Sequence, residues 1–128
     1  MSEKKRTIIS FTDLKTWQKG HKLVLEIYAV TKGFPKEELF GLSSQMRRSA
    51  ASITANIAEG YGRHGLKERV QFYYVAQGSL AELKDQLLIA RDVGYLNEES
   101  FRKLIDSADS TGALLYGLIK KSKEYAAA

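Results

Sequence analysis

The sequence predicts an all-α fold, an antiparallel up-down-up-down four-helix bundle. Four segments carry apolar residues at alternating spacings of three and four, which line one helix face, and no segment shows the alternation of a strand. One proline and ten glycines among 128 residues favour a few long elements. Because the connections are short, successive helices should be antiparallel neighbours. We expect residues 1–128 to form a single domain whose ordered core covers about residues 11–124.

The first helix is expected to begin at a capping residue, Thr12 or Asp13, and to end at Gly33 and Pro35. Its core-facing residues are expected to be Leu14, Trp17, His21, Val24, Tyr28 and Thr31. The second helix should stop at the Gly-Tyr-Gly run of residues 60–62. Its core-facing residues are expected to be Leu42, Met46, Ala50, Ile53 and Ile57.

The third helix should close at Gly94, and the fourth should begin after Asn97, a capping residue followed by two glutamates that suit the positive end of the helix dipole. Leu96 and Phe101 are placed to pack together around this cap. The core-facing residues of the third helix are expected to be Tyr73, Ala76, Leu80, Leu83, Leu87 and Ala90. Those of the fourth are expected to be Phe101, Leu104, Ala108, Thr111, Leu115 and Leu118.

Several large apolar residues fall outside these four lines and widen the apolar face of the helices. They are Leu25, Ile27, Phe72, Val75, Leu88, Ile89 and Ile119. An apolar band this wide indicates either a second contact surface, and hence self-association, or a broader core in a monomer. The periodicity alone leaves both readings open.

Small side chains dominate residues 49–58 of the second helix and recur at residues 76–81 of the third. If antiparallel partners have numbers that add up to about 127, Arg48 lies opposite Ser79, and the two helices approach closely. A glycine in the middle of a helix costs about 1 kcal/mol in helix propensity, and a close approach at Gly78 would compensate for it.

A polar line beside these small residues contains no lysine and has short side chains at its centre, which argues against a plain solvated face. Glu59 meets the negative end of the helix dipole, an unfavourable contact of up to about 1 kcal/mol that Arg63 could offset. Glu82 is a candidate partner for Arg48. We therefore predict a hydrogen-bonded polar network between the second and third helices. Its expected members are Gln45, Arg48, Ser52, Asn56, Glu59, Arg63 and Glu82.

The charge balance is basic, with 20 Lys and Arg against 15 Asp and Glu, and the whole excess lies in residues 1–65. Such a balance favours an acidic partner such as nucleic acid, although many small proteins are as basic without one. The absence of cysteine excludes disulfides and thiolate chemistry and fits a reducing, cytoplasmic location. No apolar run approaches the roughly 20 residues of a membrane span, so no membrane partner is expected.

No catalytic, cofactor or metal site is expected, and we predict that the protein is not an enzyme. No glutamate is followed three residues later by histidine, as a di-iron bundle requires, and His21 and His64 lie on different elements. Residues 60–62 are too short for a dinucleotide fingerprint and follow a helix rather than a strand. We expect His21 to be a hydrogen-bonded histidine of the core or of an interface.

One long pattern resembles the 23S rRNA-intervening sequence protein family, also called four helix bundle proteins. It reads Gly41-Leu42-x-x-Gln45-Met46-Arg47-Arg48-x-Ala50-x-Ser52-Ile53-x-x-Asn56-Ile57-Ala58-Glu59-Gly60-x-Gly62-Arg63. Further matches are Asp13-Leu14-x-x-Trp17, Phe34-Pro35, Phe72, Ala76, Gly78-Ser79 and Glu82-Leu83, so the resemblance covers residues 11–122. Gly65 departs from the pattern, because the family usually carries a serine there that suits the cap of the third helix.

The resemblance implies a homopentamer, a ring of bundles around a central opening, which would account for the surplus apolar residues. A related bundle, the accessory protein of diversity-generating retroelements, is a basic pentamer that works with a reverse transcriptase and nucleic acid. By this analogy we expect a non-enzymatic pentamer that binds RNA or a ribonucleoprotein. The alternative is a protein–protein scaffold or accessory subunit without nucleic-acid contact. The candidate RNA-binding residues are Arg47, Arg48, Arg63, Lys67 and Arg69, with Tyr61 or His64 able to stack on a base.

Overall fold

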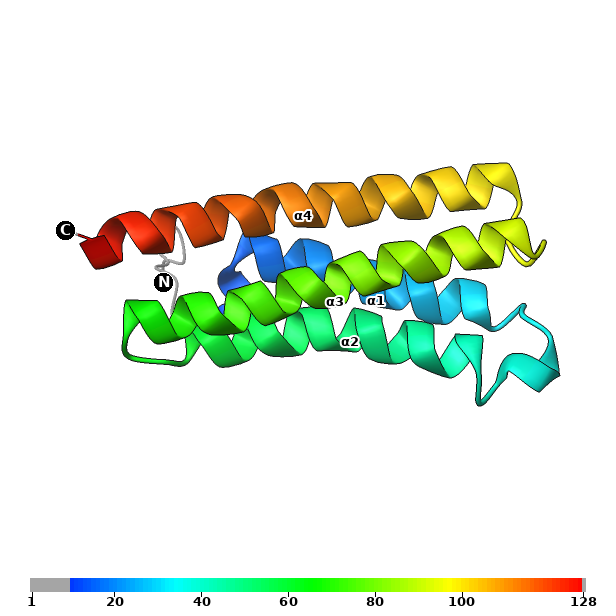
Figure 1. Cartoon of the computed structure of the whole chain (residues 1–128), viewed down its shortest axis with the longest axis horizontal. Helices are drawn as coiled ribbons and strands as arrows, with labels where there is room; N and C mark the ends of the chain where they lie inside the picture. The colour runs from blue at the N-terminus through cyan, green and yellow to red at the C-terminus, as the bar shows by residue number, and fades with distance from the viewer. Residues whose placement is uncertain (1–9, 128) are drawn as a thin grey trace, which may run out of the picture.

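The computed structural model describes residues 10–127, which form four long helices and no strand (Figure 1). The helices are α1 (Lys15–Thr31), α2 (Leu42–Tyr61), α3 (Leu66–Asp92) and α4 (Glu98–Ala127). Short 3-10 turns, η1 (Phe11–Asp13) and η2 (Lys36–Glu38), precede α1 and α2. Each helix runs antiparallel to the next, which confirms the predicted four-helix bundle.

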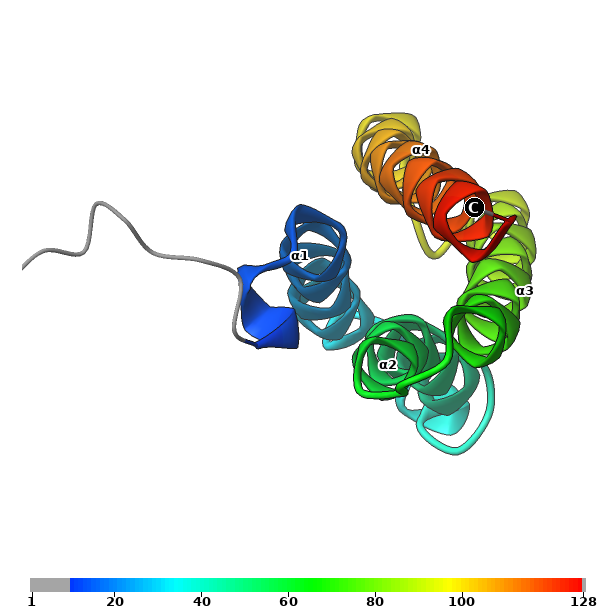
Figure 2. The same ribbon diagram turned by 90° about the vertical axis from the view of Figure 1, so that its left-hand side faces the viewer.

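The helices stand in the order α1, α2, α3, α4 when the bundle is seen from its end (Figure 2). Each helix packs against the next along the chain, and α4 also packs against α1, whereas the backbones of the diagonal pairs do not come close within the described residues. With 17 residues, α1 is much shorter than α4, which has 30. The last turns of α4 and the first turns of α3 therefore extend past the start of α1 (Figure 1).

The core is formed as predicted on three of the four helices. All the residues expected to face inward on α3 are buried. On α2 the exception is Leu42, which is half-buried, and on α4 it is Leu118, where the next residue, Ile119, is buried in its place. In these three helices, the spacing of the apolar residues therefore correctly predicts which face is buried.

The predicted core face of α1 is only partly right: Thr31 is buried, and Leu14, Trp17 and Val24 are half-buried and pack against the core. The buried residues of α1 are Thr16, Gly20, Leu23, Ile27 and Thr31, whereas His21 and Tyr28 are exposed. A Cβ atom at Gly20 would lie 3.0 Å from the Thr54 methyl group, so α1 approaches α2 through a residue without a side chain. Because glycine and threonine contribute little to an apolar pattern, the most regular apolar line on α1 lies beside the buried face and not on it.

The ends of the helices partly follow the predicted signals. Leu14, without a side-chain hydrogen bond, holds the N-cap position of α1, and Ser10 caps the preceding 3-10 turn instead. The predicted cap of α4 is confirmed, because the Ser100 N–H donates to Asn97 Oδ1 at 2.7 Å. Leu96 and Phe101 are both buried beside this cap. The helix α4 continues to Ala127, three residues beyond the expected core, and residues 1–9 and 128 lie outside the described residues.

The register between α2 and α3 differs from the prediction by about one helical turn. The hydroxyls of Ser52 and Ser79 lie 2.8 Å apart, so Ser79 does not pair with Arg48. Gly60 lies against the Tyr73 ring, where an added Cβ would come within 2.7 Å of Cε1. At Gly78 an added Cβ would meet nothing within 4 Å. The close approach of the two helices therefore occurs at Gly60, and the prediction for Gly78 is wrong.

Candidate functional site

Short hydrogen bonds between polar side chains connect α2 to α3 near the middle of the bundle. Besides the Ser52–Ser79 pair, Asn56 Nδ2 donates to the Ser52 carbonyl at 2.8 Å and to its hydroxyl at 3.1 Å. A neighbouring hollow of about 500 Å³ is lined by Gln45, Arg48, Ser49, Ser52, Ser79 and Glu82. Four members of the predicted network, Gln45, Arg48, Ser52 and Glu82, thus lie together around one hollow.

The predicted ion pair between Arg48 and Glu82 does not form. Both side chains are exposed beside the hollow, and no hydrogen bond or ion pair within residues 10–127 joins them. Glu59 pairs with Arg63 at 2.6 Å, but this pair lies along α2 rather than between helices. An exposed pair of this kind contributes only about 0.3–0.5 kcal/mol, so it offsets the helix dipole without fixing the fold.

Two of the candidate RNA-binding arginines are bonded to groups of their own chain. Arg47 Nε donates to the Thr31 hydroxyl at 2.8 Å, and its guanidinium lies 5.0 Å from the centre of the Tyr28 ring. Arg69 Nε donates to the Arg63 carbonyl at 2.7 Å. These bonds connect α1 to α2 and close the loop between α2 and α3. A tightly bound phosphate would have to use the guanidinium donors that remain.

Arg63 is also engaged, and it is the third of these arginines with an internal contact. Besides its pair with Glu59, its guanidinium lies 4.6 Å from the centre of the Phe72 ring. Arg48 and Lys67 are exposed and have no such contact with another described residue. Sixteen residues of helix and loop, about 24 Å at helical rise, separate Arg47 from Arg63, so the five candidates do not form one cluster.

The aromatic and imidazole candidates are placed differently from the prediction. His21 is exposed and lies flat on Trp17, with ring centres 4.6 Å apart and planes at 13°, so its assignment to the core is wrong. Tyr61 lies under the Arg69 guanidinium, 5.1 Å from it, and His64 is exposed in the loop. The Trp17–His21 stack therefore runs from the edge of the core, against which Trp17 packs, to the outer surface of α1, where His21 is exposed.

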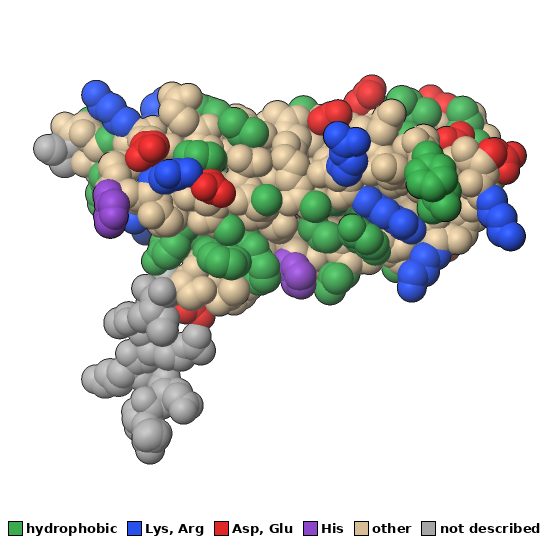
Figure 3. Space-filling model, turned by 90° about the horizontal axis from the view of Figure 1, so that it is seen from below, with side chains coloured by type: hydrophobic (Ala, Val, Ile, Leu, Met, Phe, Trp, Pro, Cys, Tyr) green, Lys and Arg blue, Asp and Glu red, His purple; other side chains and the backbone are tan. Residues whose placement is uncertain are grey.

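Many large apolar side chains remain exposed after the core has formed. Of the surplus residues, Ile27 and Ile119 are buried and Phe72 is half-buried, whereas the other four are exposed. Those four are Leu25, Val75, Leu88 and Ile89. Seen from below, hydrophobic side chains form groups along the lower edge of the molecule, on the side of α1 (Figure 3). The broader-core reading thus explains only part of the surplus.

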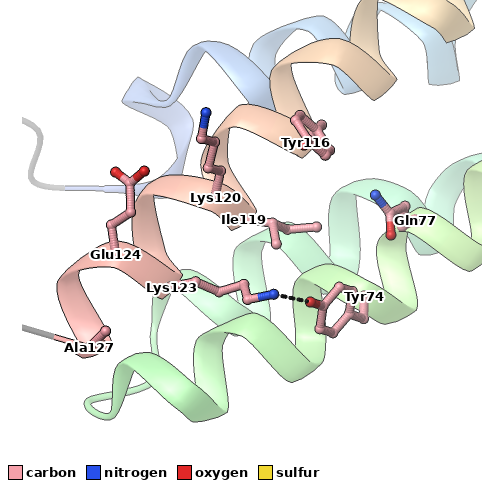
Figure 4. A pocket seen from close by; sticks show the side chains of 8 residues that line it. All are labelled: Tyr74, Gln77, Tyr116, Ile119, Lys120, Lys123, Glu124 and Ala127. Carbon is pink, nitrogen blue, oxygen red and sulfur yellow. Dashed lines mark hydrogen bonds between the residues drawn. The ribbon is translucent and has the colours of Figure 1, made fainter.

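An open groove between α3 and α4 was missed by the sequence analysis. Two adjoining hollows of about 410 and 310 Å³ share Tyr74, Lys123 and Ala127 (Figure 4). Tyr116 and Lys120 of α4 also line the larger hollow. The spacing of positions 116, 120 and 123 is a signal for one exposed helix face, but no apolar line marks it.

A hydrogen-bonded carboxylate joins two loops at the other end of the bundle. Glu38 accepts hydrogen bonds from the Leu42 N–H at 3.0 Å and from the Tyr95 hydroxyl at 2.8 Å. The Leu42 N–H, and after it the Tyr95 hydroxyl, hold the pKa of Glu38 below its ordinary value. The bond to Glu38 raises the pKa of Tyr95. This contact fixes the start of α2 against the loop between α3 and α4.

Neither a metal-binding cluster nor a membrane-spanning helix occurs among residues 10–127. Among residues 10–127, no three His, Asp or Glu side chains come close enough together to hold a metal ion. In the same part of the chain, no helix combines the length and the apolar character that crossing a membrane requires.

The comparisons with known proteins concern the whole bundle. No curated protein matches the chain. Its fold is similar to the crystal structure of a protein with unknown function from the S23 ribosomal protein family of Bacteroides thetaiotaomicron, with a TM-score of 0.74 and 21% sequence identity. That similarity covers 82% of this chain and 98% of the other. The family model of the 23S rRNA-intervening sequence protein matches residues 12–117. The chain therefore belongs to the 23S rRNA-intervening sequence protein family.

Proposed function

We propose that the protein is a non-enzymatic, self-assembling bundle that forms a homopentamer and binds RNA or a ribonucleoprotein through its basic surface. The observation that carries this proposal is the set of large apolar side chains left exposed around a complete four-helix core. Contiguous apolar surface on a small protein marks an interaction site, since it gains free energy when it is removed from water.

Two separate apolar faces support assembly as a ring. The outer face of α1 carries the Trp17–His21 stack and Leu25, which is 56% exposed. The outer face of α3 carries Val75 and Ile89, which are 53% and 44% exposed. Because α1 and α3 are diagonal in the bundle, these faces point in different directions (Figure 2). Contacts between two different faces generate a ring when the rotation from one copy to the next closes, and five is the number that the family resemblance implies.

RNA is the favoured partner for two reasons. The family name refers to ribosomal RNA, and the chain has a formal charge of +5. The exposed cations include Arg48 and Lys67, which are free to contact phosphate. Nothing in the motif content suggests base-specific readout, so binding should depend on shape and phosphate charge and should weaken with salt.

The scaffold reading is the second candidate, and a specific observation favours it. Arg47, Arg63 and Arg69 make contacts within the chain and contribute to its folding. If these residues serve only the fold, the basic charge is left for solubility, and the assembled surface would recruit another protein. Binding to RNA separates the two candidates.

Light scattering on the full chain tests the assembly. We expect a mass of about 72 kDa, five times the 14.4 kDa chain. Leu25→Asp should lower this mass, because it places a charge on the outer face of α1 without touching the core. Tyr125→Asp is the matched control, since it changes an exposed side chain at the far end of α4. A wild-type mass of 14.4 kDa at high concentration would contradict the assembly.

Fluorescence anisotropy with a labelled, structured RNA tests the partner. We expect micromolar affinity that falls steeply as salt rises from about 50 to 200 mM, because phosphate contacts release counterions. The double variant Arg48→Glu, Lys67→Glu should weaken binding at least about tenfold and leave the mass unchanged. No binding at low salt would remove the RNA proposal and leave the scaffold.

A further inference from the structure

The groove between α3 and α4 has the dimensions of a small-ligand site. Its two hollows adjoin at Tyr74 and Lys123 and together extend from Tyr116 to the end of α4. Figure 4 shows Lys123 and Tyr74 pointing toward one another across the groove. Pockets of about 300–1,000 Å³ are typical of sites for small organic molecules, and each hollow falls within this range.

Two tyrosine rings form exposed flat surfaces in the groove. Tyr116 is 62% exposed and Tyr74 is 41% exposed, although both lie beside the buried Ile119. Within residues 10–127, the Tyr116 hydroxyl has no hydrogen-bond partner, so the fold does not require this ring where it is. An exposed aromatic face of this kind accepts a nucleic-acid base by stacking, whatever the identity of the base.

The charge of the groove favours an anion. Lys67, Lys120 and Lys123 line it, against one acidic side chain, Glu124. Lys123 Nζ donates to the neutral hydroxyl of Tyr74 at 3.2 Å, so no carboxylate is bonded to this ammonium group among the described residues. About two helical turns beyond the groove the arrangement differs, because Lys84 pairs with Asp109 at 2.7 Å. The uncompensated positive charge is therefore confined to the part of α3 and α4 that also carries the exposed tyrosines.

We propose that this groove binds one or two nucleotides of a single-stranded RNA segment. A base stacks on Tyr116, with Tyr74 beside it, while Lys120 and Lys123 contact the adjoining phosphates. A single strand is required because the faces of bases within a duplex are covered by their neighbours. The inference rests on the proposed RNA function, and it moves the main contact from the engaged arginines to α3 and α4.

The test measures the affinity of the full-length protein for a labelled single-stranded RNA of about eight nucleotides at about 50 mM salt. Lys120→Glu with Lys123→Glu should weaken binding about tenfold or more. The matched control is Arg102→Glu with Lys103→Glu, which makes the same charge change at two exposed positions near the start of α4. The control should stay within about threefold of the wild type, because its cations lie far from the groove.

A second pair of variants tests the stacking platform. Tyr116→Ala should weaken binding about tenfold, whereas Tyr116→Phe should keep the wild-type affinity, because stacking needs the ring and not the hydroxyl. An RNA with 4-thiouridine at its centre should crosslink to Tyr116 or Tyr74 on irradiation. Circular dichroism should show unchanged helicity, since Tyr116 is mostly exposed.

Four outcomes would overturn the groove proposal. If the groove variants and the control lose affinity equally, or if Tyr116→Ala binds as the wild type does, RNA binding stands but lies elsewhere. If the variants at Lys120 and Lys123 break the assembly in light scattering, the groove is a contact between copies. If the wild type binds neither this RNA nor the structured one at low salt, the groove proposal and the RNA function fail together.

Discussion

At the end of the bundle where the α1–α2 and α3–α4 loops meet, Tyr95 donates to Glu38 and packs against Phe34, with ring centres 5.2 Å apart. At the opposite end, α4 runs past the start of α1, and its last turns line an open groove. The first end uses its polar and aromatic side chains to hold the fold together. The second leaves Tyr116 and Lys120 without such a contact, and its bond between Lys123 and Tyr74 joins two exposed side chains. We therefore expect ligand binding at the open end, where fewer polar and aromatic side chains are needed to hold the helices together.

The largest expected effect is the loss of stability when one large core side chain near each end of the bundle is replaced by alanine. Leu87→Ala should reduce the free energy of unfolding by about 2–5 kcal/mol, because Leu87 is fully buried and its removal leaves a cavity. Ile119→Ala should fall at the low end of that range, since Ile119 lines the open groove and its site can fill with water. Urea unfolding at one protein concentration measures both. Equal losses of unfolding free energy in the two variants would contradict the proposed difference between the two ends of the bundle.

The second effect concerns the crossing of α2 and α3. Gly60→Ala should reduce the free energy of unfolding by about 1–3 kcal/mol, because its methyl group would collide with Tyr73. Gly78→Ala is the matched control in the same pair of helices. It should raise stability by up to about 1 kcal/mol, because it improves helix propensity without meeting any atom. Thermal melting of the two variants should therefore shift in opposite directions, and parallel shifts would show that the crossing lies elsewhere.

The smallest effect is the pH dependence of the closed end. Because the folded state holds the pKa of Glu38 below the ordinary value of a glutamate, Glu38 stabilises the fold at pH values above that ordinary pKa. This contribution is lost as pH falls through the lowered, folded-state pKa. Glu38→Gln should lower the melting temperature at neutral pH and reduce the difference between neutral and acid pH. Glu99→Gln, at a carboxylate 3.9 Å from Lys103, should leave that difference unchanged.

The sequence predicted the core of α2, α3 and α4 because burial there follows large apolar side chains. It was less successful on α1, where the small residues Gly20 and Thr16 are buried beside Leu23 and Ile27 and do not stand out in an apolar pattern. The α2–α3 register was missed by about one turn because small residues occur at several neighbouring positions and do not select one pairing. Gly60 selects it through the shape of the Tyr73 ring, which only the folded structure shows.

The candidate site was harder to predict than the fold. A sequence shows which residues are basic, but it does not show that Arg47 meets Thr31 from another helix or that Arg69 meets a loop carbonyl. These are tertiary contacts that consume the donors on which the RNA prediction depended. The groove was missed because Tyr74 and Tyr116 belong to no core line, and exposed lysines are common on any helix surface.

The bond from Arg69 to the Arg63 carbonyl has a consequence for proteolysis. Trypsin cleaves after arginine when the chain is extended and both the side chain and the carbonyl of that residue are available. At Arg63 the carbonyl accepts from Arg69, and the guanidinium is held by Glu59 and by the Phe72 ring. We therefore expect trypsin to cut the peptide bond to His64 slowly, although His64 itself is exposed. A short, solvent-facing connection between two helices is then a poor substrate for trypsin, because the arginine carbonyl and guanidinium that the protease must bind are already bonded within the chain.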